Sequence, residues 1–461
     1  MKVAVPAEIR LYAADKKIYP RAVHGWFAAW RWLLVWGTQL VFYGGAWLTW
    51  NDRQAILFDI AHRKFYIRGL VFWPQDVIYL AVLLIICALS LFLFTAVAGR
   101  LWCGYACPQT VYTEIFLWVE RMIEGERNKR IRLDRDPLHV RKAALKTAKH
   151  AAWIAIALWT GFTFVGYFTP IRELGSEMLA LAAGPWETFW ILFYGFATYG
   201  NAGWMREQVC TYMCPYARFQ SAMFDKDTLV ITYDAKRGEP RGARSRSADD
   251  RHLGDCVNCG ICVQVCPTGI DIRNGLQYQC IGCTACIDGC NDVMDRVGAP
   301  RGLIRYSTQN ALERHLTPAQ TLARALRPRV LVYASILAAI VIGAAIGLYA
   351  RVPLKVDVIR DRAAIAREVE GGRIENVYRL QIMNTAEAKR TFEISAAGLP
   401  TLEIAGASRV ELEGTASRMV PVRLRVQPGA AAAGTHRIEF AVSAIGAEGV
   451  EVREKSVFII R

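Results

Sequence analysis

Eight of the thirteen cysteines in this 461-residue chain fall within residues 256–290, in two runs of the same spacing. The runs read Cys256-x2-Cys259-x2-Cys262-x3-Cys266-Pro267 and Cys280-x2-Cys283-x2-Cys286-x3-Cys290-Asn291. Thiols at this density are held by disulfides or by metal, and the C-x2-C steps favour metal in a reducing compartment. The segment is therefore expected to fold tightly around metal centres.

The spacing of each run is that of a bacterial ferredoxin, in which the fourth cysteine of one run ligates the cluster of the other. We therefore predict two [4Fe–4S] clusters, which pass single electrons between a donor and an acceptor elsewhere. Structural zinc is the alternative for C-x2-C pairs, but the doubled eight-cysteine pattern favours iron–sulfur. The expected ligands are Cys256, Cys259, Cys262 and Cys290 for the first cluster, and Cys280, Cys283, Cys286 and Cys266 for the second.

Two further cysteine pairs have the form C-x3-C-P, namely Cys103 and Cys107 before Pro108, and Cys210 and Cys214 before Pro215. Each pair follows an apolar stretch, which predicts a weak internal repeat. The i, i+4 spacing predicts that both sulfurs of a pair lie on one helical face, so that two pairs place four thiols together. Such soft ligands select Cu(I), zinc or iron–sulfur, which predicts a copper site or an additional redox-metal site. The alternative is four small buried residues that pack helices together.

Five segments are predicted to span a membrane as helices, which requires about 20 mostly apolar residues. One of them, Val77–Ala98, has no charged side chain in 22 residues, which argues against a buried helix of a soluble core. Trp and Tyr at several span ends fit an interfacial aromatic belt. The five spans run roughly over Trp32–Trp50, Val77–Ala98, Ala151–Phe168, Trp186–Thr198 with its flanks, and Arg329–Ala350.

Loop charges predict the orientation of these spans. Residues 121–150 contain ten Lys and Arg against four Asp and Glu, whereas residues 169–185 contain one Lys or Arg. Because cytoplasmic loops carry the excess of positive charge, we expect the N-terminus and residues 204–328 in the cytoplasm and everything after Ala350 outside. The loop 51–75 has four basic residues yet would lie outside, so we expect an apolar segment in the membrane interface there.

The composition agrees with a membrane protein. The chain is 53% hydrophobic, with a mean hydropathy of +0.19 and a formal net charge of +15. Nucleic-acid binding is the other explanation of excess positive charge. We exclude it because the basic residues flank apolar spans and do not form one basic domain.

Residues 354–461 contain no cysteine and consist of short β-prone runs between turn-rich pieces such as QPGAAAAG. Strands of this length at regular spacing predict an antiparallel β-sandwich. The predicted architecture is therefore a multi-domain membrane protein with an α-helical bundle, an α+β ferredoxin-like module and a β-sandwich. Its expected parts are a cytoplasmic segment at 1–31, a four-helix transmembrane region at 32–225, a cytoplasmic ferredoxin module at 226–328, a transmembrane helix at 329–351 and an outer sandwich at 352–461.

Taken together, these features resemble the CcoG family (also FixG or RdxA) of cytochrome c oxidase accessory proteins. The resemblance extends to KIYPRAVHGWFAAWR at residues 17–31, FDIAHRKFYIRGLVFWPQD at residues 58–76, both C-x3-C-P pairs and the doubled cysteine run. It also covers the C-terminal domain, which in this family is immunoglobulin-like. NapH-like quinol dehydrogenase subunits share the cysteine motifs but lack the N-terminal block and the sandwich domain.

The resemblance implies a bacterial inner-membrane protein, with its C-terminal domain periplasmic, that serves assembly of cbb-type cytochrome c oxidase. The implied activity is reduction of Cu(II) to Cu(I). The implied partners are oxidase assembly factors and copper chaperones or transporters, with an unidentified cytoplasmic electron donor. Copper chemistry agrees with this role, since Cu(I) is the form that sulfur ligands bind.

Two other functions fit the same residues. One is a redox relay between a quinol pool and another protein, as in the NapH-like subunits. The other is a scaffold without enzymatic activity, in which the sandwich domain docks assembly partners and the clusters sense redox state. Cu(II) reduction by the purified protein separates the reductase from both.

Overall fold

The computed structural model describes residues 17–243, 253–361, 366–447 and 449–460. The first sixteen residues of the expected segment 1–31 lie outside this range. The chain divides into two compact units. Unit 1 comprises Met1–Gly45, Leu84–Gly166 and Leu174–Ala338, and unit 2 comprises Ala46–Leu83, Tyr167–Glu173 and Ala339–Arg461.

Within the described ranges, two helices have the length and composition to cross a membrane. They are α2 (Val77–Ala98), which follows the single turn η1 (Pro74–Asp76), and α15 (Pro328–Tyr349). Large apolar side chains on both helices are exposed. The prediction of five spans is therefore corrected to two candidate spans.

The other three predicted spans lack the length or the composition of a membrane-spanning helix, each for a different reason. α1 (Trp26–Gly45) contains four Trp and three Gly, which favour hydrocarbon less than Leu or Ile do, together with the polar Arg31 and Gln39. α6 (Val140–Val165) begins well before Ala151, in a stretch with several lysines and an arginine. α8 (Pro185–Thr198) has 14 residues of α-helix and continues as the π-helix η2 (Tyr199–Met205).

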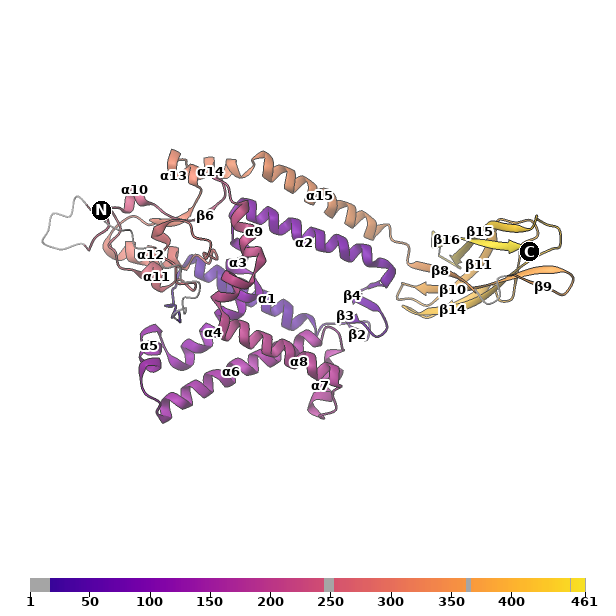
Figure 1. Ribbon diagram of the computed structural model, residues 1–461, viewed down its shortest axis with the longest axis horizontal. Helices are drawn as coiled ribbons and strands as arrows, with labels where there is room; N and C mark the ends of the chain where they lie inside the picture. Colours follow the sequence, from indigo (N-terminus) through magenta and orange to yellow (C-terminus); the bar gives the residue numbers. More distant parts are fainter. Residues whose placement is uncertain (1–16, 244–252, 362–365, 448, 461) are drawn as a thin grey trace, which may run out of the picture. The chain divides into compact units, whose positions relative to one another are not determined.

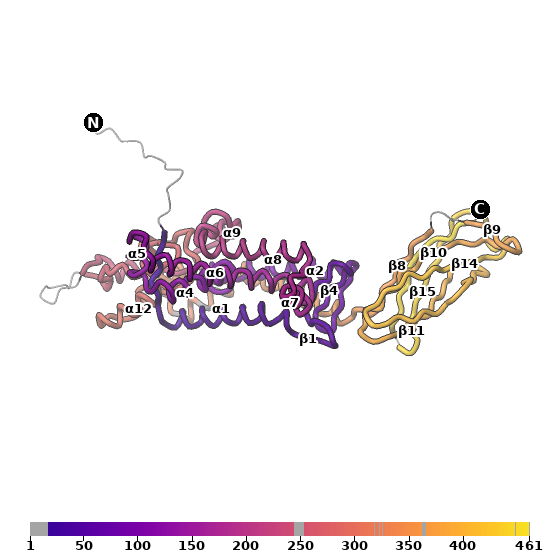
Figure 2. Tube along the Cα trace, turned by 90° about the horizontal axis from the view of Figure 1, so that it is seen from below, coloured from indigo at the N-terminus to yellow at the C-terminus, as the bar shows by residue number. Residues whose placement is uncertain are grey.

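In unit 1, α6 contacts both α4 (Pro108–Glu124) and α8 (Figure 1 and Figure 2). Close approach of α6 and α8 requires Gly161, because a Cβ there would lie 2.3 Å from the Ile191 carbonyl oxygen. On the α4 side, Phe116 stacks on Trp153 with ring centroids 5.3 Å apart. The other helices of this region are α3 (Leu101–Tyr105), α5 (Arg127–Arg135), α7 (Ile171–Leu179), η3 (Val209–Met213) and α9 (Pro215–Met223).

In the chain, the eight-cysteine segment falls between β6 (Val230–Tyr233) and β7 (Ile304–Ser307), which pair with each other as a small antiparallel sheet. Inside it, α11 (Ile261–Gln264) packs on α12 (Ala285–Val297). Its buried core combines Ile231, Met294 and Leu303 with several of the cysteines. The remaining short helices are α10 (Ala235–Gly238), η4 (Ile272–Asn274), α13 (Gln309–Arg314) and α14 (Pro318–Ala325).

The C-terminal part of unit 2 is a sandwich of two antiparallel sheets, as predicted (Figure 2). One sheet has the order β12-β14-β10-β8, with β9 also paired to β10, and the other has the order β13-β11-β15-β16. Alternate residues of both sheets face one apolar core that includes Tyr378, Phe392 and Phe440. The strands are β8 (Leu354–Arg360), β9 (Arg367–Val369), β10 (Arg373–Asn384), β11 (Arg390–Ala397), β12 (Glu403–Ala405), β13 (Arg409–Leu412), β14 (Ser417–Val426), β15 (Gly434–Ala444) and β16 (Glu451–Ile460).

Residues 51–75 form short antiparallel strands; their location in the membrane interface stays a prediction. Their alternating apolar residues pair as a three-stranded sheet, and Leu57, Tyr66 and Val71 pack with Met383 of β10 in one buried cluster. The following buried carboxylate of Asp76 forms ion pairs with Arg351 and Lys355. The strands are β1 (Thr49–Trp50), β2 (Arg53–Gln54), β3 (Ile56–Asp59), β4 (Lys64–Ile67) and β5 (Leu70–Phe72).

Candidate metal centres

The four cysteines predicted for the first cluster line one small cavity. Cys256 and Cys259 come from the loop before α11, and Cys262 comes from α11 itself. Cys290 reaches the same cavity from α12, because α11 and α12 pack together. The fourth cysteine of the second run thus lies with the first three of the first run.

The four cysteines predicted for the second cluster line a second small cavity, Cys266 together with Cys280, Cys283 and Cys286. Cys262 lines both cavities. The two candidate cluster positions are therefore neighbours across α11.

Both cysteine runs have the same backbone conformation. Asn258 (φ +54°) and Gly260 (φ +66°) occupy the left-handed region in the first run, and Gly282 (φ +71°) and Thr284 (φ +61°) occupy it at the matching positions of the second. Alternation of right- and left-handed residues turns successive N–H groups to one side, which forms the concave anion sites found around iron–sulfur clusters. The duplicated spacing therefore encodes a duplicated turn.

The donor set in each cavity fits a cubane. In the described parts of the chain, no three Cys, His, Asp or Glu side chains converge closely enough to hold a single metal ion. Tetrahedral zinc draws its sulfurs to about 2.3 Å from one point, whereas a [4Fe–4S] cubane spaces its four cysteines around a larger body. Four cysteines that line one cavity match the ligand number of a [4Fe–4S] cubane.

Burial favours the neutral thiol at several of these cysteines. It raises the thiol pKa of Cys262 to about 11 and those of Cys283 and Cys290 to about 12. Because the thiolate is the ligand, loading iron releases protons and supplies the positive charge that buried thiolates need.

The four C-x3-C-P cysteines also lie together. The partly buried thiol of Cys210 interacts electrostatically with those of Cys103, Cys107 and Cys214. Burial raises the pKa of Cys103 to about 11 and that of Cys210 to about 12. The two pairs of the predicted repeat therefore lie near one another, although no three of the sulfurs converge on one point; we call these four cysteines the four-thiol site.

The prediction that the sulfurs of each pair share one helical face is wrong. α3 ends at Tyr105, and Cys107 is extended (φ −63°, ψ 128°) as the N-cap of α4. Cys214 has the same role (φ −78°, ψ 109°) before α9. The reason is the proline that follows each cysteine, since it disfavours a helical residue before it and suits the first position of a new helix.

The four-thiol site lies against the second cysteine run. Cys103 and Cys210 pack on the apolar cluster that contains Cys283. Gly104 permits this approach, because a Cβ there would lie 2.5 Å from the carbonyl oxygen of Gly282. The Tyr105 hydroxyl is 2.8 Å from that of Thr284, so α3 is held directly on the loop of the second cavity.

Arg100, just before α3, joins three segments of the site. Its guanidinium donates to the carbonyl oxygens of Tyr278 and Cys280 in the second cysteine run. It also donates to the Ala217 carbonyl and, over 2.8 Å, to the Ser221 hydroxyl of α9. This one buried side chain therefore fixes α9 and the second run relative to the first C-x3-C-P pair.

The ferredoxin module also holds the start of α1. Asp288 on α12 accepts hydrogen bonds from the Ala28 amide (2.7 Å) and the Phe27 amide (3.3 Å), which have no partners within the first turn of the helix. Arg31 on α1 donates to the Cys283 carbonyl over 2.9 Å. Sequence analysis missed Asp288 and Arg31 as site residues; the acidic position between Cys286 and Cys290 was the available signal.

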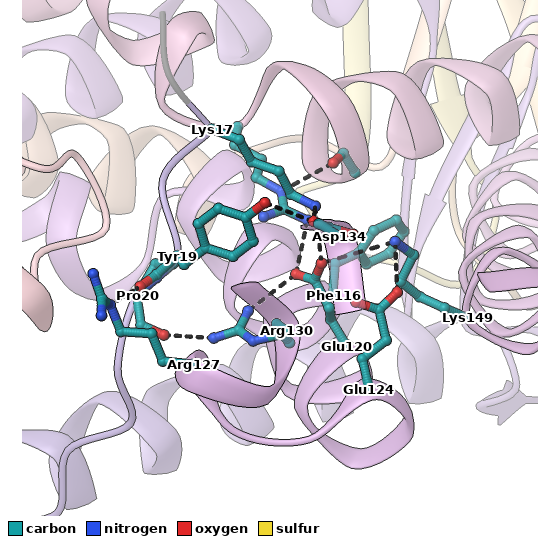
Figure 3. Close-up of polar contacts among 12 residues, drawn as sticks. Lys17, Tyr19, Pro20, Phe116, Glu120, Glu124, Arg127, Arg130, Asp134 and Lys149 are labelled. Atoms are coloured by element: carbon teal, nitrogen blue, oxygen red, sulfur yellow. Dashed lines mark hydrogen bonds and ion pairs between the residues drawn. The ribbon is translucent and has the colours of Figure 1, made fainter. Parts of the chain in front are cut away.

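A network of buried ion pairs joins α4, α5 and α6 (Figure 3). Glu120 has no exposed side-chain surface and lies 3.2 Å from Arg130 and 3.0 Å from Arg206. Lys149 is 3.8 Å from Glu120 and 3.0 Å from Glu124. Burial raises the pKa of Glu120, but Arg206 and Arg130 outweigh that effect and hold it below the ordinary value.

Comparison with known proteins assigns each region. Residues 205–309 match the 4Fe–4S dicluster domain, and residues 80–125, which include the first C-x3-C-P pair, match a 4Fe–4S binding domain. Residues 344–461 match the IG-like fold at the C-terminal of FixG, a family described as a putative oxidoreductase. A crystal structure of a FixG-related protein from Vibrio parahaemolyticus covers 23% of this chain and 95% of its own, with 23% identity and a TM-score of 0.21.

Several relatives match most of the chain, and two of them are 40% identical to it. The nitrogen fixation protein FixG of Rhizobium meliloti is 40% identical over 86% of this chain and 82% of its own. Protein RdxA of Cereibacter sphaeroides is 40% identical over 89% of this chain and 87% of its own. With the dicluster ferredoxin module and the immunoglobulin-like sandwich both present, the chain belongs to the FixG/RdxA family of iron–sulfur electron-transfer proteins.

Proposed function

We propose that this protein uses its iron–sulfur module to reduce Cu(II) to Cu(I) for the assembly of cbb-type cytochrome c oxidase. The observation that carries the proposal is that Cys103 and Cys210 pack against the group of buried apolar side chains that contains Cys283, one of the predicted ligands of the second [4Fe–4S] cluster. When bound, [4Fe–4S] clusters store and pass single electrons. One electron converts one Cu(II) to one Cu(I), so the stoichiometry of donor and substrate agrees.

The residues divide into two groups by their proposed role. The eight cysteines of residues 256–290 would hold the two clusters, four in each cavity. Copper, as the substrate, would be bound by a pair of the thiols of Cys103, Cys107, Cys210 and Cys214, since no three of them converge on one point in the structure. Soft sulfur ligands stabilise Cu(I) over Cu(II) and so favour its reduction. Partial exposure of these four thiols leaves the product a way out.

A second candidate function is favoured by the match of residues 80–125 to a 4Fe–4S binding domain. The four C-x3-C-P thiols would then hold a further iron–sulfur centre, and the protein would be an electron relay. Metal content separates the two candidates, since the relay needs additional iron where the reductase needs none.

The test compares wild-type protein, isolated without oxygen, with a variant in which the four C-x3-C-P cysteines are alanine. Cys87→Ala, an exposed position in α2, is the matched control. We expect about eight irons per chain in all three proteins. After reduction by dithionite, only the quadruple variant should fail to convert added Cu(II) into chelator-bound Cu(I). Additional iron that is lost in that variant would favour the relay, and unchanged copper reduction would reject the proposed site.

We further propose that α2 and α15 anchor the protein in the inner membrane, with the ferredoxin module cytoplasmic and the sandwich periplasmic. Chain order supports this orientation: the ferredoxin module and the basic stretch 121–150 both lie between α2 and α15, whereas the sandwich follows α15, and an excess of positive charge favours the cytoplasmic side. A periplasm-dependent reporter fused after Arg461 should be active, and the same reporter fused after Ser307 should be silent. Activity of both fusions would contradict this orientation.

The proposed partners are oxidase assembly factors and copper chaperones or transporters, with the cysteine-free sandwich as the surface for protein contact. A strain without this protein should assemble less active cbb-type oxidase when copper is scarce, and added copper should partly restore it. Oxidase activity across a copper titration measures this. A deficit that is the same at every copper concentration would contradict the copper role.

A further inference from the structure

A cavity of about 780 Å³ in unit 1 has no role in the function proposed above. It lies between the start of α1, α4 and the second cysteine run. Cys283 of the ferredoxin module and Cys210 of the four-thiol site both line it. A molecule bound there would therefore touch the loops that carry both candidate redox centres.

One end of the cavity is aromatic. Trp32 and Trp36 of α1 and Trp118 of α4 form a trio with ring centroids 6.2 to 6.4 Å apart. Trp36 is 56% exposed and Trp118 is 37% exposed. This wall is suited to a flat apolar molecule that enters from an apolar surrounding, because aromatic faces pack offset or edge-on with such rings.

The other end of the cavity is polar and includes one N–H group of the buried Arg31 side chain that makes no hydrogen bond with the described residues. The guanidinium of Arg31 is 8% exposed, donates through Nη1 to the Cys283 carbonyl and lies 3.7 Å from Glu114. Among the described residues, its Nε has no hydrogen-bond partner. A buried donor left unsatisfied is destabilising, so this N–H favours a ligand with an acceptor oxygen. His24 and Glu114 line the same end.

We propose that this cavity binds a membrane quinol and that the quinol is the electron donor to the ferredoxin module. The aromatic head would stack against the tryptophan trio, with its oxygens at Arg31 and Glu114, and its apolar tail would leave past Trp36. The volume lies within the range of about 300–1,000 Å³ that is usual for small-molecule sites. The inference rests on the proposed function only in that the module receives the electrons, and it replaces the cytoplasmic donor expected from the sequence.

The reaction at this site balances without a further reactant. Both O–H bonds of the quinol break, and the two protons pass to the Glu114 carboxylate and the His24 imidazole. The two electrons leave singly to the [4Fe–4S] centres, which are the oxidant, and the quinol becomes the quinone. The oxidation releases two electrons from one quinol, so it requires acceptors that each take one electron, as the two [4Fe–4S] clusters would.

The charges argue against a nucleotide donor such as NADH. A diphosphate needs several cations that are not already paired, but of the arginines that line the cavity only Arg21 has no carboxylate partner among the described residues. Arg31 and Arg121 both face Glu114, at 3.7 and 4.0 Å. Arg130 and Arg206, also on the wall, are paired with Glu120. The carboxylates of Glu126 and Glu207 line the cavity as well and would repel phosphate.

The first test is equilibrium binding of decylubiquinone to the purified full-length protein in lipid nanodiscs. We expect about one saturable site per chain, and at least about tenfold weaker binding in a Trp36→Ala/Trp118→Ala variant. Trp30→Ala is the matched control, because Trp30 lies on α1, is 46% exposed and does not line the cavity. Thr113→Phe, which fills the cavity and keeps all three tryptophans, should weaken binding in the same way.

The second test follows electrons. Decylubiquinone should reoxidise dithionite-reduced clusters rapidly in wild type and in Trp30→Ala, and at least about tenfold more slowly in the two cavity variants. Iron content and dithionite-driven Cu(II) reduction should be unchanged in all of them, so a failure of this inference is distinct from a failure of the proposed function. Binding that does not saturate, or binding and reoxidation that are equal in control and cavity variants, would overturn the proposal.

Discussion

Replacing Glu120 by glutamine removes the carboxylate that faces two buried guanidinium groups. Its side chain has no exposed surface, and its partners Arg130 and Arg206 are 1% and 9% exposed. Loss of one member of a buried ion pair leaves an uncompensated charge, which costs about 3–5 kcal/mol. For a unit of this size, that corresponds to a fall in Tm of about 10 °C. Lys17, also a neighbour of Glu120 but with 42% of its side chain exposed, is the control; Lys17→Met should cost at most about 1 kcal/mol.

The assay is thermal unfolding in detergent without oxygen, followed by intrinsic fluorescence, with limited proteolysis at fixed temperature as a second measure. Because unfolding of such proteins is often irreversible, all variants are heated at one scan rate. Iron content is measured in parallel, so that cluster loss is not mistaken for loss of the network. A Tm for Glu120→Gln within about 2 °C of that for Lys17→Met would refute the argument that this network stabilises unit 1.

Three further outcomes follow from other contacts. Asp288→Ala should increase hydrogen exchange of the amides that open α1, whereas Asp288→Asn, which keeps an acceptor, should increase it less; equal exchange in both would contradict the capping role. Gly104→Ala places a Cβ 2.5 Å from a backbone oxygen of the second cysteine run and should cost about 1–3 kcal/mol and slow Cu(II) reduction, while Gly37→Ala, with open space around it, should do neither. Burial raises the pKa of Glu375, but ion pairs with two arginines outweigh this and hold it below the ordinary value. The stability it contributes to the sandwich is therefore present at neutral pH and lost as pH falls through the lowered pKa, so circular dichroism of Glu375→Gln should show weaker acid dependence than wild type.

The parts of the fold that repeat a local rule were predictable from the sequence. The β-prone runs became β10, β11, β14, β15 and β16, because alternating apolar residues specify both a strand and its buried face. The doubled cysteine spacing placed eight thiols around two cavities. In each case a short local pattern of residues is enough to predict the structure that forms.

The contacts that fix the site were not predictable, because each joins residues far apart in the sequence. Asp288 meets the start of α1 from more than two hundred residues away, and Arg100 meets Cys280 across a similar separation. The helix break at each C-x3-C-P pair was different, since its signal was present. Pro108 and Pro215 mark the start of a helix, and a reading based on i, i+4 spacing alone overlooks them.

Exposure of a single sulfur has a consequence for the lifetime of the protein in air. Cys259 is exposed, whereas the other three cysteines that line its cavity are buried. These are Cys256, Cys262 and Cys290. Dioxygen and chelators would therefore reach the first cluster at this corner. No cysteine of the second cavity is fully exposed: Cys283 is buried, and Cys266, Cys280 and Cys286 are partly exposed. Aerobic isolation should first yield protein that has lost one cluster and kept the other, and EPR during timed exposure to air would reveal the order. Oxidative damage would then begin at the first cluster and not at the second, whose Cys283 packs with Cys103 and Cys210 of the four-thiol site.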